Sequence, residues 1–80
     1  MTKGEYRVGI SFNPSNNTAV DKVKRDAADL IDYIEAWFQH NRPADGDDQI
    51  EVIRLVALAQ THIEDAAMWA VKAITKPPRS

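Results

Sequence analysis

The spacing of apolar residues between Val20 and Trp37 constrains the fold more than any other feature of the chain. Successive members of this stripe are separated by 3, 4, 3, 4 and 3 positions. This is the pattern of a helix that packs along another helix, and it is sustained for almost three heptads. The stripe consists of Val20, Val23, Ala27, Leu30, Ile34 and Trp37, widened by Ile31 and Phe38. We predict a helix over residues 18–41, with Thr18 and Asp21 forming its N-terminal cap.

A second helix follows after a short connection. Residues 42–47 contain a proline and a glycine and almost nothing apolar, which predicts a loop between antiparallel helices. The second helix is predicted over residues 48–75, with Asp48 and Glu51 able to cap its first turn. A pair of prolines then prevents further helix, so residues 76–80 are expected to form a tail.

The segment before the first helix is predicted to be an arm and a turn over residues 1–17. From Tyr6 to Phe12 the residues alternate roughly in polarity, which favours an extended stretch. Residues 13–17 combine proline, serine and asparagine, the residues that favour turns. The predicted fold is therefore all-α, a single domain over residues 1–80 in which a short extended N-terminal arm precedes an antiparallel helical hairpin.

The second helix predicts self-association, because it is apolar on more than one side. One stripe suits the first helix, but Leu55, Leu58 and Trp69 lie on another face that a lone hairpin cannot cover. A chain of 80 residues without cysteine also lacks the disulfides that stabilise many small folds. We expect a homo-oligomeric bundle.

The charge of the chain is −2 overall but is unevenly distributed. The segment through Arg25 carries a net +3, the segment from Asp26 to Glu51 carries −7, and the remainder carries +2. The acidic middle would repel DNA or RNA polymers, whereas a compact anion can lie among the local cations. No apolar run approaches the roughly 18 residues that span a bilayer, so we expect no membrane association and a cytoplasmic location.

The candidate binding residues gather around the predicted turn. Phe12 could stack on a base, and Lys22, Lys24 or Arg25 could pair with a phosphate, although Lys22 is expected to face solvent. Asn13 and Ser15 could contact ligand edges. Lys24 follows a residue of the apolar stripe and could reach across an interface. The alternative is that Phe12 packs the arm on the hairpin and the cations are solvated. Residue types alone leave both interpretations open.

Other polar groups are weaker candidates for a site. His62 and Asp65 lie three apart, but two ligands are too few for a metal centre. The acid pairs Asp29/Asp32 and Glu64/Asp65 could bind Mg²⁺ as in all-α nucleotide pyrophosphohydrolases, yet no Glu-x-x-Glu repeat occurs. Phosphate-loop and nucleophile motifs are also absent, so we expect no catalytic residues, no metal and no cofactor. Lys72 interrupts an apolar stretch and either extends to solvent or binds an anion.

Two segments resemble a known family. The sequence LAQTHIEDAAMWAVKAI, residues 58–74, resembles the C-terminal helix of the phage anti-CBASS sponges, grouped as the anti-CBASS and anti-Thoeris hairpin domain. Residues 12–32 are similar to the arm and first helix of that family in their order of an aromatic, a turn, Val-Lys and Leu-Ile-Asp. The alternatives are the Mg²⁺-dependent hydrolase above and a purely structural phage bundle.

The resemblance implies a homohexamer that sequesters cyclic oligonucleotide messengers, cGAMP among them, in the host bacterial cytoplasm without cleaving them. Cyclic dinucleotides would be held between two protomers by Phe12 and Lys24, and cyclic trinucleotides at separate sites by Lys72. Where the family has a tyrosine, Phe12 keeps the stacking face but lacks the hydroxyl. Where the family has an arginine, Lys72 cannot make a bidentate phosphate contact.

Overall fold

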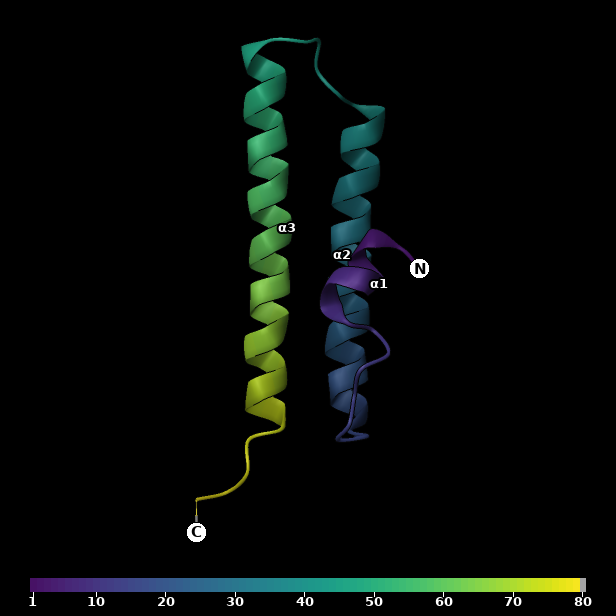
Figure 1. Cartoon of the computed structure of the whole chain (residues 1–80), viewed down its shortest axis with the longest axis vertical. Coiled ribbons are helices and arrows are strands. Elements are labelled where there is room, and N and C mark those ends of the chain that lie inside the picture. Colours follow the sequence, from purple (N-terminus) through teal and green to yellow (C-terminus); the bar gives the residue numbers. More distant parts are fainter. Residues whose placement is uncertain (80) are drawn as a thin grey trace.

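The computed structural model describes residues 1–79 and contains three helices, α1 (Lys3–Val8), α2 (Thr18–His40) and α3 (Asp47–Ile74). Helices α2 and α3 run antiparallel, and α1 lies across α2 (Figure 1). No strand occurs in this part of the chain, so the all-α class is confirmed. Residues 76–79 of the predicted tail form neither helix nor strand, and Ser80 lies outside the described residues.

The prediction of an extended arm was wrong, because α1 is a helix. Thr2 and Glu5 form a reciprocal capping box, in which the Thr2 hydroxyl accepts from the Glu5 amide and the Glu5 carboxylate accepts from the Thr2 amide. Gly9 ends the helix in the left-handed region with φ 65°, a conformation that glycine adopts without steric cost. These local contacts outweigh the weak alternation of polarity after Tyr6.

Helix α2 begins at the predicted residue, but its cap differs from the prediction. The side chain of Asn17 accepts a hydrogen bond of 2.8 Å from the Ala19 amide, so Asn17 is the N-cap. The predicted cap by Thr18 and Asp21 was wrong, because Asp21 instead accepts from the side-chain amide of Asn13. The turn is thereby attached directly to the first turn of α2.

The cap predicted for the second helix was also wrong. Gly46 occupies the N-cap position of α3 and supplies no side-chain hydrogen bond. Asp47 and Asp48 lie within the first turn, where carboxylates interact favourably with the helix dipole. Glu51 forms an ion pair with Arg54 at 2.6 Å rather than capping the helix.

The buried face of α2 is rotated from the predicted stripe. Val20, Ala28 and Ile31 are almost completely buried, whereas Leu30 and Trp37 remain 49% and 47% exposed. The prediction assumed that α2 packs only against the second helix. Because α1 covers α2 from another side, the buried face is centred between both neighbours.

The arm packs on α2 through a backbone approach that requires glycine. A Cβ atom at Gly4 would lie 2.1 Å from the carbonyl oxygen of Ala28. The Gly4 amide donates to Asp32 Oδ1 at 2.7 Å, which fixes the position of α1 along α2.

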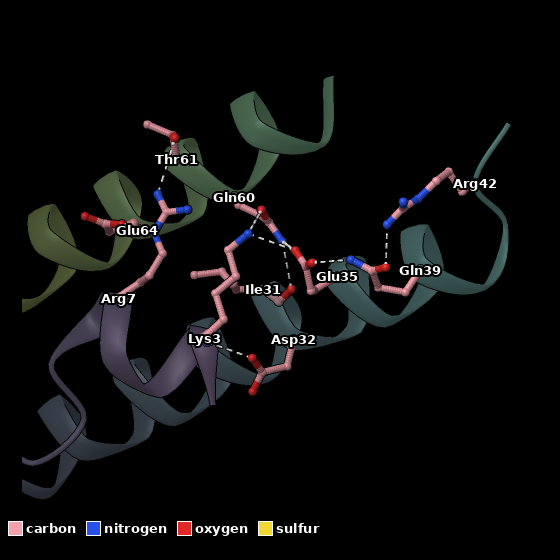
Figure 2. Close-up of polar contacts among 11 residues, drawn as sticks. Lys3, Arg7, Ile31, Asp32, Glu35, Gln39, Arg42, Gln60, Thr61 and Glu64 are labelled. Atoms are coloured by element: carbon pink, nitrogen blue, oxygen red, sulfur yellow. Dashed lines mark hydrogen bonds and ion pairs between the residues drawn. The ribbon is translucent and has the colours of Figure 1, made fainter. Parts of the chain in front are cut away.

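A partly buried polar cluster joins all three helices (Figure 2). The Lys3 ammonium contacts Glu35 Oε1 at 2.8 Å and Gln60 Oε1 at 2.9 Å. The amide of Gln60, a fully buried residue, donates to the Ile31 carbonyl and to Glu35. Hydrogen bonds from Lys3, Gln39 and Gln60 lower the pKa of Glu35 to about 2, so its carboxylate stays charged at neutral pH.

Large apolar side chains remain on the surface, as the second stripe of the sequence predicted. The predicted residues Leu55, Leu58 and Trp69 are 50%, 41% and 61% exposed. The chain extends only 13 Å along its shortest axis, little more than one helix, so a single layer cannot bury both sides of α3. Across residues 1–79, no helix has both the length and the apolar character needed to cross a membrane.

Candidate functional site

The turn before α2 is held by its own side chains. The Ser15 hydroxyl donates to Asn13 Oδ1 at 2.6 Å and accepts from the Asn17 amide at 3.2 Å. The side-chain amide of Asn13 donates to the Asn17 carbonyl at 2.9 Å and to Asp21 at 3.0 Å. Asn13 and Ser15 therefore fix the conformation of the segment that follows Phe12.

Lys24 lies directly beneath this segment. Its side chain comes from the second turn of α2 and the residue is only 7% exposed. The ammonium donates to the carbonyl of Gly9 at 3.0 Å and to the carbonyl of Phe12. Its nitrogen lies 5.4 Å from the centre of the Phe12 ring, a cation–π distance, and Phe12 is 71% exposed. In this chain Lys24 contacts its own arm.

The buried Lys24 ammonium has carbonyl partners but no carboxylate partner among residues 1–79. Buried charges in proteins are usually paired with an opposite charge, because carbonyl dipoles replace only part of the lost hydration. Lys24 therefore retains an attraction for an anion. An exposed aromatic face lies next to it.

Arg25, the neighbouring cation, is already paired. Its guanidinium contacts Glu5 Oε2 and Asp29 Oδ1, each at 2.8 Å. The hydrogen bond from Arg25 is the main cause that lowers the pKa of Glu5 to about 2, and the same contacts raise the pKa of Arg25. Arg25 thus links α1 to α2.

A cavity of about 280 Å³ brings together four of the predicted site residues, Phe12, Asn13, Ser15 and Lys24. Its remaining wall residues are Pro14, Val20, Val71 and Thr75. A second cavity of about 200 Å³ borders Lys24 on the side of α1 and is also lined by Arg7 and Glu64.

Lys72 does not line either of these cavities. It is exposed on α3, and its ammonium lies 5.2 Å from the centre of the Trp69 ring. The pair forms a separate cationic and aromatic surface near the C-terminal end of the helix.

Sequence reasoning did not single out Pro14, Val71 and Thr75. Pro14 is part of the turn and could have been included with its neighbours. Val71 and Thr75 are four apart, hence on one face of the last turns of α3, but only the packing of α3 beside α2 brings them to the cavity.

Three of the four acids considered for a magnesium site contact other residues of the protein. Asp29 pairs with Arg25, Asp32 accepts from the Gly4 amide, and Glu64 pairs with Arg7 at 2.6 Å. Within residues 1–79, no group of three or more histidine, aspartate or glutamate side chains is close enough together to hold a metal ion.

The fold and the site define a class of protein: a small helical hairpin whose N-terminal arm places an aromatic ring over a buried cation. The family model described as Acb2/Tad1, hairpin domain, matches residues 4–75, and the chain belongs to this family. The predicted membership of the anti-CBASS and anti-Thoeris sponges is thereby confirmed, and it implies the general role of a phage anti-defence sponge. Searches of curated proteins and of solved structures each found no significant match.

Proposed function

We propose that this protein binds cyclic dinucleotide messengers and sequesters them without cleavage, thereby inhibiting CBASS-type antiphage defence. The observation that carries the proposal is the buried ammonium of Lys24, which lacks a carboxylate partner among residues 1–79 and lies beneath the exposed ring of Phe12. A nucleotide offers the two matching groups, a phosphate and a flat base.

In this proposal the base stacks on Phe12 and the phosphate contacts Lys24. Stacking of a base on an aromatic side chain contributes about 1–3 kcal/mol. The phosphate would exchange weak carbonyl contacts of the ammonium for a charge-assisted hydrogen bond. The N-terminus of α2, which begins at Thr18, contributes a favourable dipole for an anion. Asn13 and Ser15 form part of the wall.

We further propose that the protein acts as a homo-oligomer, a hexamer by its family, in which a neighbouring copy completes the site. Support comes from the apolar surface that a single chain leaves exposed. On α2, the exposed residues Leu30, Tyr33 and Trp37 follow helical spacing, and α3 adds Leu55 and Leu58. Apolar stripes of this length on both helices are typical of interfaces.

Cyclic trinucleotides are proposed to bind separately, at Lys72. Its ammonium is exposed beside Trp69, so a phosphate and a base could both find a partner there. Because Lys72 lies outside the cavity at Phe12, a Lys72→Ala variant is expected to keep its dinucleotide affinity.

Isothermal titration calorimetry against a panel of cyclic di- and trinucleotides tests the proposal. Phe12→Ala is expected to weaken dinucleotide binding about 5- to 150-fold, the equivalent of one lost stacking contact of about 1–3 kcal/mol. Phe12→Tyr keeps the aromatic face and should bind like the wild type. Lys22→Ala is the matched control, because Lys22 is exposed and its ion pair within residues 1–79 is with Asp26 on the same helix. Absence of binding by the wild-type protein would contradict the proposal.

Lys24→Ala is a less clean test than Phe12→Ala. The substitution removes the proposed phosphate contact, but it also removes the lysine donor from the carbonyls of Gly9 and Phe12, although the Gly9 carbonyl keeps its bond from the Phe12 amide. The thermal stability of the Lys24→Ala variant is therefore measured as well, because a displaced arm would also reduce its binding.

A further inference from the structure

Arg7 is one of two side chains through which α1 makes hydrogen bonds to α3. Its Nε contacts Glu64 Oε1 at 2.6 Å and its NH2 group donates to Thr61 Oγ1 at 3.3 Å (Figure 2). The other is Lys3, which reaches Gln60. Most contacts of α1 are with α2, and these two side chains connect the arm directly to α3.

The backbone that follows α1 connects this helix directly to the candidate site. Immediately after α1, the Ile10 amide donates to the Glu5 carbonyl at 3.0 Å and the Phe12 amide donates to the Gly9 carbonyl at 2.9 Å. The carbonyls of Gly9 and Phe12 are the two partners of the Lys24 ammonium. A displacement of α1 therefore moves the aromatic ring and both partners of the lysine together.

Arg7 and Glu64 also border the site. Both line the cavity of about 200 Å³ that has Lys24 in its wall. Their side chains are 26% and 32% exposed, so the pair is partly shielded from solvent. Glu64 makes its ion pair with the arm, and its negative charge lines the cavity on the α1 side of Lys24, which shares this lysine with the cavity at Phe12.

We propose that the Arg7–Glu64 ion pair positions the ligand site by fixing the orientation of α1 over the hairpin. The inference rests on the proposed function, because the site that it positions is the one at Phe12 and Lys24. Glu64 acts here through Arg7 and need not touch the ligand.

The substitution Glu64→Gln distinguishes positioning from simple electrostatics by the sign of its effect. Removing a negative charge near an anion site, and freeing Arg7 from its partner, should by itself tighten the binding of a phosphate group. If the pair positions the arm, the same substitution weakens binding instead. Partly exposed ion pairs typically contribute up to about 1 kcal/mol, so the expected loss is about two- to fivefold.

The experiment compares Glu64→Gln with Glu51→Gln in the full-length protein, using 3′,3′-cGAMP as the calorimetric probe. Glu51 is the matched control, because it lies on the same helix and also pairs with one arginine, Arg54. A second measurement needs no ligand: hydrogen exchange of the Ile10 and Phe12 amides. Both amides bond within the arm, whose helix of six residues is too short to remain folded without packing on the hairpin.

The proposal expects weaker binding and faster exchange of both amides for Glu64→Gln, and neither change for Glu51→Gln. Unchanged or tighter binding by Glu64→Gln, with wild-type exchange rates, would overturn it while leaving the proposed function intact. If the wild-type protein itself fails to bind cyclic dinucleotides, the proposed function fails, and the positioning role fails with it.

Discussion

Gly4→Ala tests whether the docked arm is required for the site. The added Cβ would lie 2.1 Å from the Ala28 carbonyl oxygen and 2.8 Å from Asp32 Oδ1, whereas ordinary van der Waals contacts begin at 3.4 Å. The nearest obstacle is helix backbone, which cannot rotate away. Helix α1 must therefore move outward by more than an ångström.

The energetic balance favours displacement of the arm. Overpacking costs about 1–3 kcal/mol, and loss of the hydrogen bond from the Gly4 amide to Asp32 costs about 1.5–3 kcal/mol. Alanine recovers about 1 kcal/mol as a better helix former than glycine. The net cost is roughly 1.5–5 kcal/mol, and a ligand that requires the docked arm should bind about tenfold more weakly or worse.

Calorimetry with a cyclic dinucleotide measures the loss, and circular dichroism checks that α2 and α3 remain folded. Gly46→Ala is the matched control. Gly46 has φ 128° and open space around it, so its substitution strains the loop without contacting the arm. That variant should lose some stability and keep its ligand affinity. Wild-type affinity in Gly4→Ala would refute the reasoning that the arm forms the site.

Three further predictions concern stability and assembly. Hydrogen bonds lower the pKa values of the Glu5 and Glu35 carboxylates from 4.5 to about 2. The contribution of these carboxylates to the stability of the folded protein is therefore complete above about pH 4.5 and is lost as the pH falls toward 2. Protection of the arm amides, expressed relative to the exchange rate of an unfolded chain at each pH, should fall over that interval, and constant protection would contradict this. Ile31→Ala, at a fully buried position, should lower the free energy of unfolding by about 2–5 kcal/mol, which is comparable with the whole stability of so small a fold. A urea midpoint close to that of the wild type would argue against the described core. Leu30→Glu and Trp37→Glu should shift the protein toward monomers in size-exclusion chromatography with light scattering, and an unchanged mass would exclude that face of α2 from the interface.

The two long helices could be predicted because their apolar periodicity persists over many turns. Helix α1 was missed, although its capping box at Thr2 and Glu5 and its terminal Gly9 are visible in the sequence. A helix of six residues is too short to be stable by itself and depends on packing. Because α1 was not predicted, the sequence also did not show that α2 buries Lys24 and Ala28, each one position beyond Val23 and Ala27 of the predicted stripe.

The residues of the candidate site that lie close together in the sequence could be predicted, whereas the residues that α3 contributes could not. Phe12, Asn13 and Lys24 are joined by a short turn and the first turns of one helix, so their proximity needs little tertiary information. The position of Lys24 beside the apolar stripe already favoured it over Arg25, and the structure adds that Arg25 is paired with Glu5 and Asp29. The contribution of Val71 depends on the register of α3 against α2, which periodicity alone does not determine.

The most direct test of the central claim is recovery of the ligand from a saturated complex. The protein is incubated with 3′,3′-cGAMP and Mg²⁺, separated from free nucleotide and denatured, and the released nucleotide is identified by mass spectrometry. Sequestration without cleavage predicts that the cyclic dinucleotide is retained by the folded protein and recovered intact in a fixed ratio to protein. Linear products, or no retained nucleotide, would contradict the account.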